Sequence, residues 1–351
     1  MAVVARTPTD GGRRGRALPY AAALFTTVLW SSSYVLIKEG VSEIPPLYFA
    51  TLRYGLAFII LLTADLALSR RGRRHPPVGR RKGILLVVAG VGGYTVAQGL
   101  QYVGLYYLPA VTTSFLLNFN PFFVLLLGVG LLGERVTPAQ LMGFGLAVLG
   151  AFAFFSEKVA WGGQVFGVAV VVASGVGWAV YMVAVRSFYG PHGLSPLRLT
   201  TVTMGVGVAG MVVLTAASGQ YAPLTLDGAL TVVWLASVNT ALAFVLWNWS
   251  LKAIPPYELT ILQDLMLIEI ALFALLFLGE PITPVMAGGM GMVLAGVLVV
   301  QLKGRPAKAV PAIADQGTDA PKSQVSVEGL QRVFGRRHGE QPSGCEPVPS
   351  P

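Results

Sequence analysis

The chain has 351 residues, of which 54% are apolar and only 12% are charged. A soluble domain carries about 25% charged residues, so this composition excludes a protein that faces water on all sides. The single cysteine, Cys345, excludes disulfides and cysteine-ligated metal sites within the chain. A net charge of +9 would suit nucleic-acid binding in a soluble protein, but here the positions of the basic residues matter more than their sum.

Apolar runs of about twenty residues recur along most of the chain, which is typical of membrane-spanning helices. The predicted fold class is therefore an all-α integral membrane protein. We predict ten transmembrane helices, at residues 18–37, 47–68, 83–106, 110–132, 138–155, 165–186, 197–217, 228–250, 256–278 and 284–302. Residues 1–17 and 303–351 are rich in proline, glycine and charge, and we expect both to be disordered tails.

Lysine and arginine are distributed unevenly over the predicted loops. With both termini in the cytoplasm, every basic residue except Lys38, Lys158 and the intramembrane Arg53 falls on the cytoplasmic side. This distribution satisfies the positive-inside rule and predicts a multi-pass protein of the cell (plasma) membrane with cytoplasmic termini. The basic loop 70–82 is expected to bind anionic lipid rather than nucleic acid, because no nucleic-acid-binding fold surrounds it.

One short segment is written twice. LGERVTP at 132–138 recurs 146 residues later as LGEPITP at 278–284. Other residues recur at the same spacing, namely Pro109 and Pro255, Gly133 and Gly279, Glu134 and Glu280, Thr137 and Thr283, Pro138 and Pro284, Gly143 and Gly289, Gly145 and Gly291, and Gly150 and Gly296. At an offset of 148 residues, Trp30 and Lys38 align with Trp178 and Arg186.

We therefore predict a duplicated five-helix unit, with a first repeat at 18–155 and a second at 165–302. Because five is an odd number, the second unit has to enter the membrane from the opposite side. Inverted repeats of this kind are typical of secondary transporters, which bind their substrate near the membrane midplane where the repeats meet.

The repeated LGE turn is interpreted as structural rather than as part of transport. Gly133 can end one helix in a left-handed conformation, Thr137 can cap the next helix, and Pro138 suits its first turn. The glycines spaced by seven, Gly143 with Gly150 and Gly289 with Gly296, predict close helix packing.

Three stretches together resemble one family. LWSSSYVLIKEG, FATLRYGLAF and LPAVTTSFLLNFNPFFVLLLGVGLLGERVTPAQLMGFGLAVLG are similar to the EamA branch of the drug/metabolite transporter superfamily, and the resemblance covers residues 18–302. It implies a ten-helix carrier, most often an exporter of amino acids or other small metabolites. One departure is that the family's helix-breaking proline, present as Pro121, is replaced in the second repeat by Leu267.

Three charged residues fall inside predicted spans, where ionisable side chains usually face the bundle interior. At about 1.5 Å per residue, Arg53 and Glu269 lie at depths similar enough to pair if their helices are neighbours. They are either a static ion pair, or Arg53 binds a substrate carboxylate while an acid exchanges a proton for the solute. Asp264 aligns with Asn118, and burial without a cation would favour its protonated form. It is therefore a candidate for proton coupling, as is Glu269, with a hydrogen-bonded packing role as the alternative for Asp264.

Neutral polar and aromatic residues inside the spans complete the candidate site. The predicted substrate-binding residues are Trp30, Arg53, Gln98, Gln101, Tyr102, Asn118, Trp178, Asn239, Trp247 and Asn248, with Ser31–Ser33 and Asn120 in the same polar set. Hydrogen-bonding groups beside indole rings suit a small zwitterionic or mixed polar and apolar solute. Individually, these residues could equally form hydrogen bonds between helices.

Other functions compete less well. The histidines lie at His75, His192 and His338, in loops or tails, so we predict no catalytic residues, no metal site, no cofactor and no enzymatic activity. A membrane sensor or scaffold would normally bring a folded soluble domain. A multidrug or organic-cation exporter is a further alternative, whereas an exchanger of phosphorylated solutes would need several basic residues at midplane. The sequence pattern specifies no oligomeric state.

Overall fold

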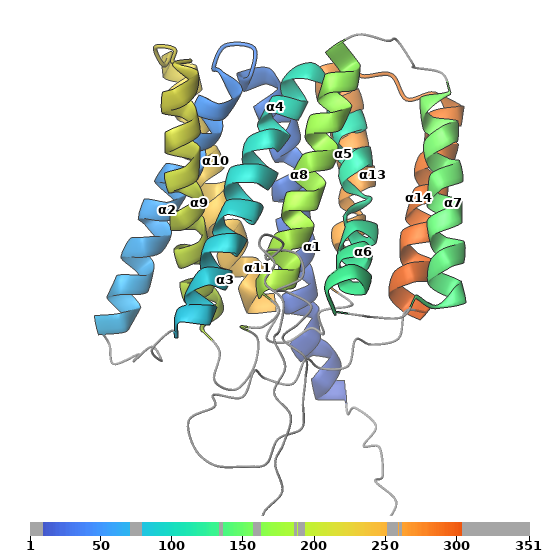
Figure 1. Ribbon diagram of the computed structural model, residues 1–351, viewed down its shortest axis with the longest axis horizontal. Coiled ribbons are helices and arrows are strands. Elements are labelled where there is room, and N and C mark those ends of the chain that lie inside the picture. Colours follow the sequence, from blue (N-terminus) through green and yellow to red (C-terminus); the bar gives the residue numbers. More distant parts are fainter. Residues whose placement is uncertain are drawn as a thin grey trace, which may run out of the picture.

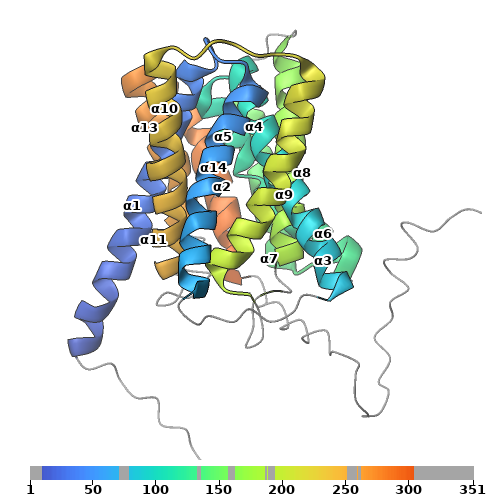
Figure 2. The same ribbon diagram turned by 90° about the vertical axis from the view of Figure 1, so that its left-hand side faces the viewer.

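The structure is a computed structural model that describes residues 10–70, 79–132, 136–156, 163–185, 188, 194–250, 259 and 262–303. In this part of the chain every regular element is a helix, and Figures 1 and 2 show the long helices side by side in one bundle. The helices are α1 (Asp10–Gly40), α2 (Pro46–Arg70), α3 (Arg80–Gly90), η1 (Val91–Gln98), α4 (Gly99–Tyr107), α5 (Ala110–Leu117), α6 (Asn120–Leu132), α7 (Pro138–Phe155), α8 (Gly163–Val185), α9 (Pro196–Ser218), α10 (Leu226–Ala236), η3 (Ser237–Leu242), α11 (Ala243–Ser250), α13 (Met266–Phe273), η4 (Ala274–Leu278) and α14 (Pro284–Lys303), the η elements being π-helical.

Nine helical runs in the described residues are long and apolar enough to cross a membrane. They are Ala17–Gly40, Pro46–Ser69, Arg80–Tyr107, Ala110–Gly130, Pro138–Phe155, Gln164–Val185, Pro196–Ser218, Leu226–Trp247 and Pro284–Leu302. Each corresponds to one of the predicted spans. The remaining predicted span, 256–278, lies partly outside the described residues, so the count of ten stays a prediction.

The first helix is longer than the sequence predicts. α1 begins at Asp10, so the expected disordered tail over 1–17 is wrong for residues 10–17. In this stretch Arg13, Arg14 and Arg16 favour a helix while Gly11, Gly12 and Gly15 disfavour it, so helix propensity alone does not explain the extension. The predicted tail 303–351 and the basic loop 70–82 lie largely outside the described residues.

α1 begins and α14 ends at the same end of the bundle, in the lower part of Figure 1. We call this end the termini face, and the other end, where α1 ends and α14 begins, the opposite face. The LGE turn of the second repeat is at the opposite face. There Gly279 has a φ of 64°, the left-handed conformation that was predicted for its counterpart Gly133, which is not among the described residues.

The predicted cap at Thr137 is confirmed. Its side chain accepts a hydrogen bond from the backbone N–H of Gln140, and the Gln140 side chain accepts one from the backbone of Thr137, with Pro138 in the first turn. This reciprocal pair is a capping box. The repeat-equivalent Thr283 accepts a hydrogen bond from the backbone N–H of Met286 in the same way.

Helix interruptions recur at equivalent places in the two halves of the chain. The π-helical segment η1 begins at Val91, and η3 begins 146 residues later at Ser237. The run from α5 to α6 is broken at Asn118 and Phe119, and the helix before α13 is broken at Leu265. Each break contains a hydrogen bond between residues three apart in sequence. Phe119 N–H donates to the Leu116 carbonyl, and Leu265 N–H donates to the Leu262 carbonyl.

The second break forms although Leu267 stands where the first half has Pro121. A proline is therefore not required to interrupt this helix, because the tightened turn itself redirects the backbone hydrogen bonds. The departure from the family pattern leaves the local backbone geometry in place.

The glycines spaced by seven bring α7 and α14 into direct backbone contact, as predicted, and Figure 1 shows these helices adjacent at one edge of the bundle. A Cβ added to Gly143 would lie 2.6 Å from the Gly296 carbonyl oxygen, and one added to Gly150 would lie 2.7 Å from that of Gly289. Residue numbers increase along α7 while those of the facing residues in α14 decrease, so the two helices are antiparallel and the contact is reciprocal. This is the geometry that two inverted repeats produce across a twofold axis.

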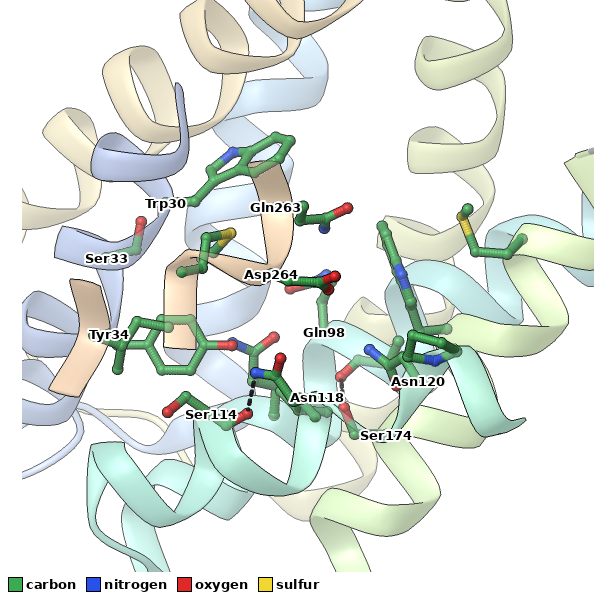
Figure 3. Close-up of a pocket in the computed structure, with 18 of the residues that line it drawn as sticks. Trp30, Ser33, Tyr34, Gln98, Ser114, Asn118, Asn120, Ser174, Gln263 and Asp264 are labelled. Atoms are coloured by element: carbon green, nitrogen blue, oxygen red, sulfur yellow. Dashed lines mark hydrogen bonds between the residues drawn. The ribbon is translucent and has the colours of Figure 1, made fainter. Parts of the chain in front are cut away.

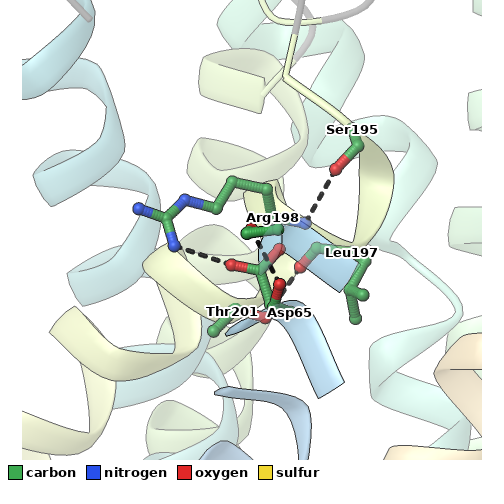
Figure 4. Close-up of polar contacts among 6 residues, drawn as sticks. Asp65, Ser195, Leu197, Arg198 and Thr201 are labelled. Carbon is green, nitrogen blue, oxygen red and sulfur yellow. Dashed lines mark hydrogen bonds and ion pairs between the residues drawn. The ribbon is translucent and has the colours of Figure 1, made fainter. Parts of the chain in front are cut away.

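A second contact between the halves joins α2 to α9. Near the termini face, Arg198 Nη1 lies 2.6 Å from Asp65 Oδ2, and the Asp65 side chain is only 3% exposed. Figure 4 shows the Arg198 guanidinium directed at this carboxylate, beside Ser195, which caps α9. Near the opposite face the same helices meet through Thr51 and Thr215, whose hydroxyl oxygens are 2.8 Å apart. An ion pair therefore holds one end of this contact and a neutral hydrogen bond holds the other.

We predict that Gly143→Ala lowers the free energy of unfolding by about 1–3 kcal/mol, because the added methyl meets a backbone carbonyl that no rotamer change can move. The measurement is the thermal unfolding midpoint of the purified chain in detergent. Gly145→Ala is the matched control, since its Cβ meets nothing within 4 Å. Equal midpoints for the two variants would contradict the assigned contact.

Candidate functional site

A cavity of about 440 Å³ lies inside the bundle and is lined by both halves of the chain. Many of its polar residues stand where a helix is interrupted. Gln98 ends η1, Asn239 and Thr240 lie in η3, Asn118 follows α5, and Asp264 precedes the break at Leu265. Figure 3 shows Gln98, Asn118 and Asp264 facing the same space. Interrupted helices inside a membrane are typical of transporter binding sites, so the fold places its polar groups where a solute would bind.

Arg53 of α2 lies at the wall of this cavity and is 4% exposed. All of its described contacts are with neutral groups. Nε donates to Thr240 Oγ1 at 2.9 Å and Nη1 donates to the Tyr102 hydroxyl at 3.2 Å. Nη2 donates to Ser33 Oγ at 3.4 Å and to the Asn239 carbonyl at 3.5 Å, and the guanidinium carbon lies 5.3 Å from the centre of the Tyr54 ring. In the described part of the chain no carboxylate contacts this guanidinium. A buried charge held only by neutral partners is costly, and an anion entering the cavity would compensate it.

The predicted ion pair between Arg53 and Glu269 is wrong. Glu269 Oε2 accepts a hydrogen bond from Ser31 Oγ at 2.7 Å, and Oε1 accepts one from Thr27 Oγ1 at 3.0 Å. Glu269 therefore lies between α13 and α1 and does not line the cavity. Depth along the helices was a poor guide because the two side chains point from their helix axes toward different neighbours. Glu269 bonds Thr27 and Ser31 of α1, whereas Arg53 bonds η3 and α4 and reaches α1 only at Ser33.

Asp264 does line the cavity. Its Oδ2 atom is buried and has no partner within normal hydrogen-bond geometry among the described residues, although the Gln301 amide lies close enough to interact with the carboxylate. In the first half, the Asn118 side chain at the equivalent position donates from Nδ2 to the Ser114 carbonyl at 3.1 Å. The Asp264 carboxylate thus keeps an unsatisfied acceptor atom next to the cavity. At the equivalent position in the first half, the Asn118 amide is already bonded to its own helix.

Two tryptophans related by the repeat stand on the cavity wall. Trp30 packs against Trp247 with ring centres 5.0 Å apart, and Trp178 stacks on Tyr181 at 5.0 Å. Gln101 lines the cavity as well. These rings give the cavity apolar surfaces beside its hydrogen-bonding groups, a combination that fixes the orientation of small solutes.

The structure gathers most, but not all, of the predicted residues. Of the predicted set, the cavity is lined by Trp30, Ser33, Arg53, Gln98, Gln101, Asn118, Asn120, Trp178, Asn239 and Asp264. Tyr102 lies behind Arg53 and Trp247 behind Trp30, each supporting a lining residue. The side chain of Asn248 lies outside the described residues.

Several lining residues were missed by the sequence analysis. Tyr54 donates a hydrogen bond from its hydroxyl to Gln98 Oε1 at 2.6 Å, and Thr240 accepts from Arg53. Both are chain neighbours of predicted residues, Arg53 and Asn239, which was the available signal. Gln301, near the end of α14, also lines the cavity, and neither atom of its amide has a hydrogen-bond partner among the described residues.

The chain matches a known protein family over most of its length. The sequence profile of the EamA-like transporter family matches residues 17–156 and matches again at residues 165–302. This chain therefore belongs to the EamA-like transporter family, and the resemblance found in the sequence is confirmed.

In the described residues, no group of three or more histidine, cysteine, aspartate or glutamate side chains is placed to hold a metal ion.

Relatives of the chain have transporter names. A protein of Archaeoglobus fulgidus named "Uncharacterized transporter" is 26% identical, with 79% of this chain and 95% of that protein covered. A "Probable terminal-alkyne amino-acid exporter" of Streptantibioticus cattleyicolor is 26% identical over 80% and 92% of the two chains. A "Probable amino-acid metabolite efflux pump" of Escherichia coli is 24% identical over 79% and 92%.

The fold is also similar to a solved crystal structure. The two chains superpose with a TM-score of 0.55 at 21% identity, over 81% of this chain and 97% of the other. This likeness concerns the fold alone. The family match, the names of the relatives and the spans found in the described residues indicate a multi-pass membrane protein of the transporter class.

We predict that the effects of Arg53→Gln and Glu269→Gln on the thermal unfolding midpoint add, because the two side chains do not meet. Contacting residues show a coupling energy of about 0.5–3 kcal/mol, so Ser31→Ala and Glu269→Gln should not be additive. The measurement is a pair of double-mutant cycles on purified protein. Coupling in the Arg53 cycle, or additivity in the Ser31 cycle, would contradict the observed contacts.

Proposed function

We propose that this protein exports a small solute with a carboxylate group, such as an amino acid or a related metabolite, by alternating access between the two faces. The observation that carries the proposal is Arg53, a buried cation at the cavity wall whose partners among the described residues are all neutral. A solute carboxylate can accept a charge-assisted hydrogen bond from the Nη1 N–H that the described contacts leave free, and a second, parallel bond would replace a long contact of Nη2 with Ser33 or Asn239. The named functions of the amino-acid exporters among the relatives support the same solute class.

The cavity supports a solute of modest size with a polar and an apolar part. Its volume of about 440 Å³ falls in the range of small-molecule sites, about 300–1,000 Å³. The polar groups around Arg53 would hold the charged end, while Trp30 and Trp178 offer flat apolar surfaces to the remainder.

The position of the cavity supports loading from the termini face. Its lining includes Gln140, the third residue of α7, and Gln301, the third from the end of α14, both near that face. The basic residues predict that this face is cytoplasmic, with both chain ends on the same side. A cavity that reaches toward the cytoplasm suits the first step of export, and ten helices in two inverted repeats would let the same site reach the other face.

Asp264 supports a coupling role for protons. It lines the same cavity as Arg53, and its unsatisfied oxygen leaves the group able to gain or lose a proton without breaking a hydrogen bond at that atom. In this scheme Asp264 takes a proton from the opposite face and releases it at the termini face, while the solute moves in the other direction. Glu269, bonded to α1 away from the cavity, is the second acid proposed to act in coupling.

Arg53→Gln tests the solute site. We expect binding of a carboxylate solute to weaken by about 100-fold or more, because the positive charge and its charge-assisted hydrogen bonding to the solute are lost. Stability should stay the same or rise, since no carboxylate is left without its partner. Arg53→Lys, which keeps the charge but not the fork, should bind at an intermediate level. Arg80→Gln, which removes an exposed charge at the start of α3, is the matched control.

The measurement is a screen of solutes against the purified chain in liposomes, with and without a pH gradient, followed by binding to each variant. Amino acids, simple carboxylic acids and organic cations are tested in parallel. Unchanged binding of the best carboxylate solute in Arg53→Gln would refute the assigned role. Preference for organic cations would favour the alternative in which Asp264, rather than Arg53, attracts the solute.

Asp264→Asn tests proton coupling. We expect solute binding and solute exchange to persist, because exchange moves no net proton, while accumulation driven by a pH gradient is lost. The repeat-equivalent Asn118 shows that this backbone geometry accepts an amide, so folding should survive. Asp227→Asn, at an exposed acid in the first turn of α10, is the control. Accumulation at the wild-type rate in Asp264→Asn would exclude this acid from coupling.

A further inference from the structure

Two charged side chains bind the same corner of the bundle at the opposite face. The corner is the turn between α4 and α5. Lys38 donates from Nζ to the carbonyl of Leu105 at 2.7 Å and to that of Leu108 at 2.9 Å. Glu280 accepts from the backbone N–H of Ala110 at 2.7 Å through Oε1, and from that of Val111 at 3.0 Å through Oε2. We call this set of four hydrogen bonds the corner clamp.

Each charge satisfies groups that helix ends leave unpaired. The last carbonyls of α4 and the first N–H groups of α5 lack partners within their own helices. A cation at a helix C-terminus and an anion at a helix N-terminus also match the helix dipoles, and charge-assisted hydrogen bonds are stronger than neutral ones. The clamp therefore holds the corner more firmly than a neutral cap would.

The clamp joins elements that are far apart in the sequence. Lys38 is near the end of α1 and the corner is in the first half of the chain, whereas Glu280 lies between η4 and α14 in the second half. Glu280 bonds the start of α5 through both carboxylate oxygens. One side chain from each half thus secures the same turn.

The clamp lies directly above the cavity. Ile37, next to Lys38, lines the cavity, and so does Ser114, which is one helical turn or about 6 Å along α5 from Ala110. α5 is only eight residues long, and it runs from the clamp at its first residue to the break at Asn118 and Phe119. A short rigid segment with a releasable bond at one end and an interrupted backbone at the other can swing as a unit.

We propose that the corner clamp is the gate of the opposite face: it is closed while the cavity is reached from the termini face, and it opens when α5 swings at the Asn118 break. This gate rests on the proposed function only through alternating access, and it does not depend on the identity of the solute. A purely static cap would instead stabilise the protein equally in every state.

The test measures access to the cavity below the clamp. The native cysteine is removed by Cys345→Ser, and Ser114→Cys then reports labelling by a membrane-impermeant maleimide in right-side-out and inside-out vesicles. Glu280→Gln weakens the clamp and should raise labelling from the opposite face by about tenfold, because the charge is lost and glutamine keeps only one oxygen to accept from the two backbone N–H groups. Labelling from the termini face should fall. Glu39→Gln, at an exposed acid beside Lys38, should change neither rate.

Unchanged labelling from both sides in folded Glu280→Gln would show a static cap and overturn the gate. If that variant does not fold, Lys38→Met weakens the other half of the clamp, and hydrogen exchange of the wild-type chain gives an independent answer. The amides of Ala110 and Val111 should exchange within minutes as the gate opens, whereas amides buried between α7 and α14 should stay protected for hours. Equal protection of both regions would also overturn the gate. Because labelling and exchange need no solute, a failed solute assignment leaves these results interpretable.

Discussion

Inside a bilayer no water is present to bond a backbone group that lacks a partner, so a membrane helix can be interrupted only where protein or a cavity takes over its hydrogen bonds. The interruptions of this bundle follow that constraint. η1, η3 and the breaks at Asn118 and Leu265 occur in repeat-equivalent pairs, and each carries polar side chains to the same cavity. The polar lining of the cavity is therefore a consequence of where the helices are irregular, rather than of residues added to regular helices.

The two intramembrane charges that the structure separates illustrate two ways of burying an ion. Glu269 is satisfied by hydroxyl groups of the neighbouring helix α1, so its hydrogen bonds are made within the protein wall. Arg53 is also hydrogen-bonded, but no group of opposite charge contacts it in the described part of the chain. The unbalanced charge is at the cavity, which is where the solute would supply the missing anion.

Much of the fold follows from the sequence, because hydropathy and repeated spacing report on length and connectivity. The spans, the cap at Thr137 and the packing of Gly143 against α14 are all visible in this way. Contacts that depend on rotation about a helix axis are not. Depth along the helices placed Arg53 beside Glu269, and only the packed structure shows that they point toward different neighbours. The corner clamp was hidden for the same reason, since Glu280 caps α5 rather than the helix that follows it.

The glycine contact between α7 and α14 limits how this protein can change. Most crowded contacts in a protein core can be relieved by a second substitution, in which the opposing side chain becomes smaller. Here the residue opposite Gly143 is already glycine, and the nearest atom that a new methyl group would meet is the backbone carbonyl oxygen of Gly296 at 2.6 Å, so trimming the Val300 side chain, which lies at 2.8 Å, would not remove the clash. A selection for second-site suppressors of a substitution at Gly143 should therefore yield no change at Gly296. Any suppressors should instead map to residues that shift one whole helix relative to the other.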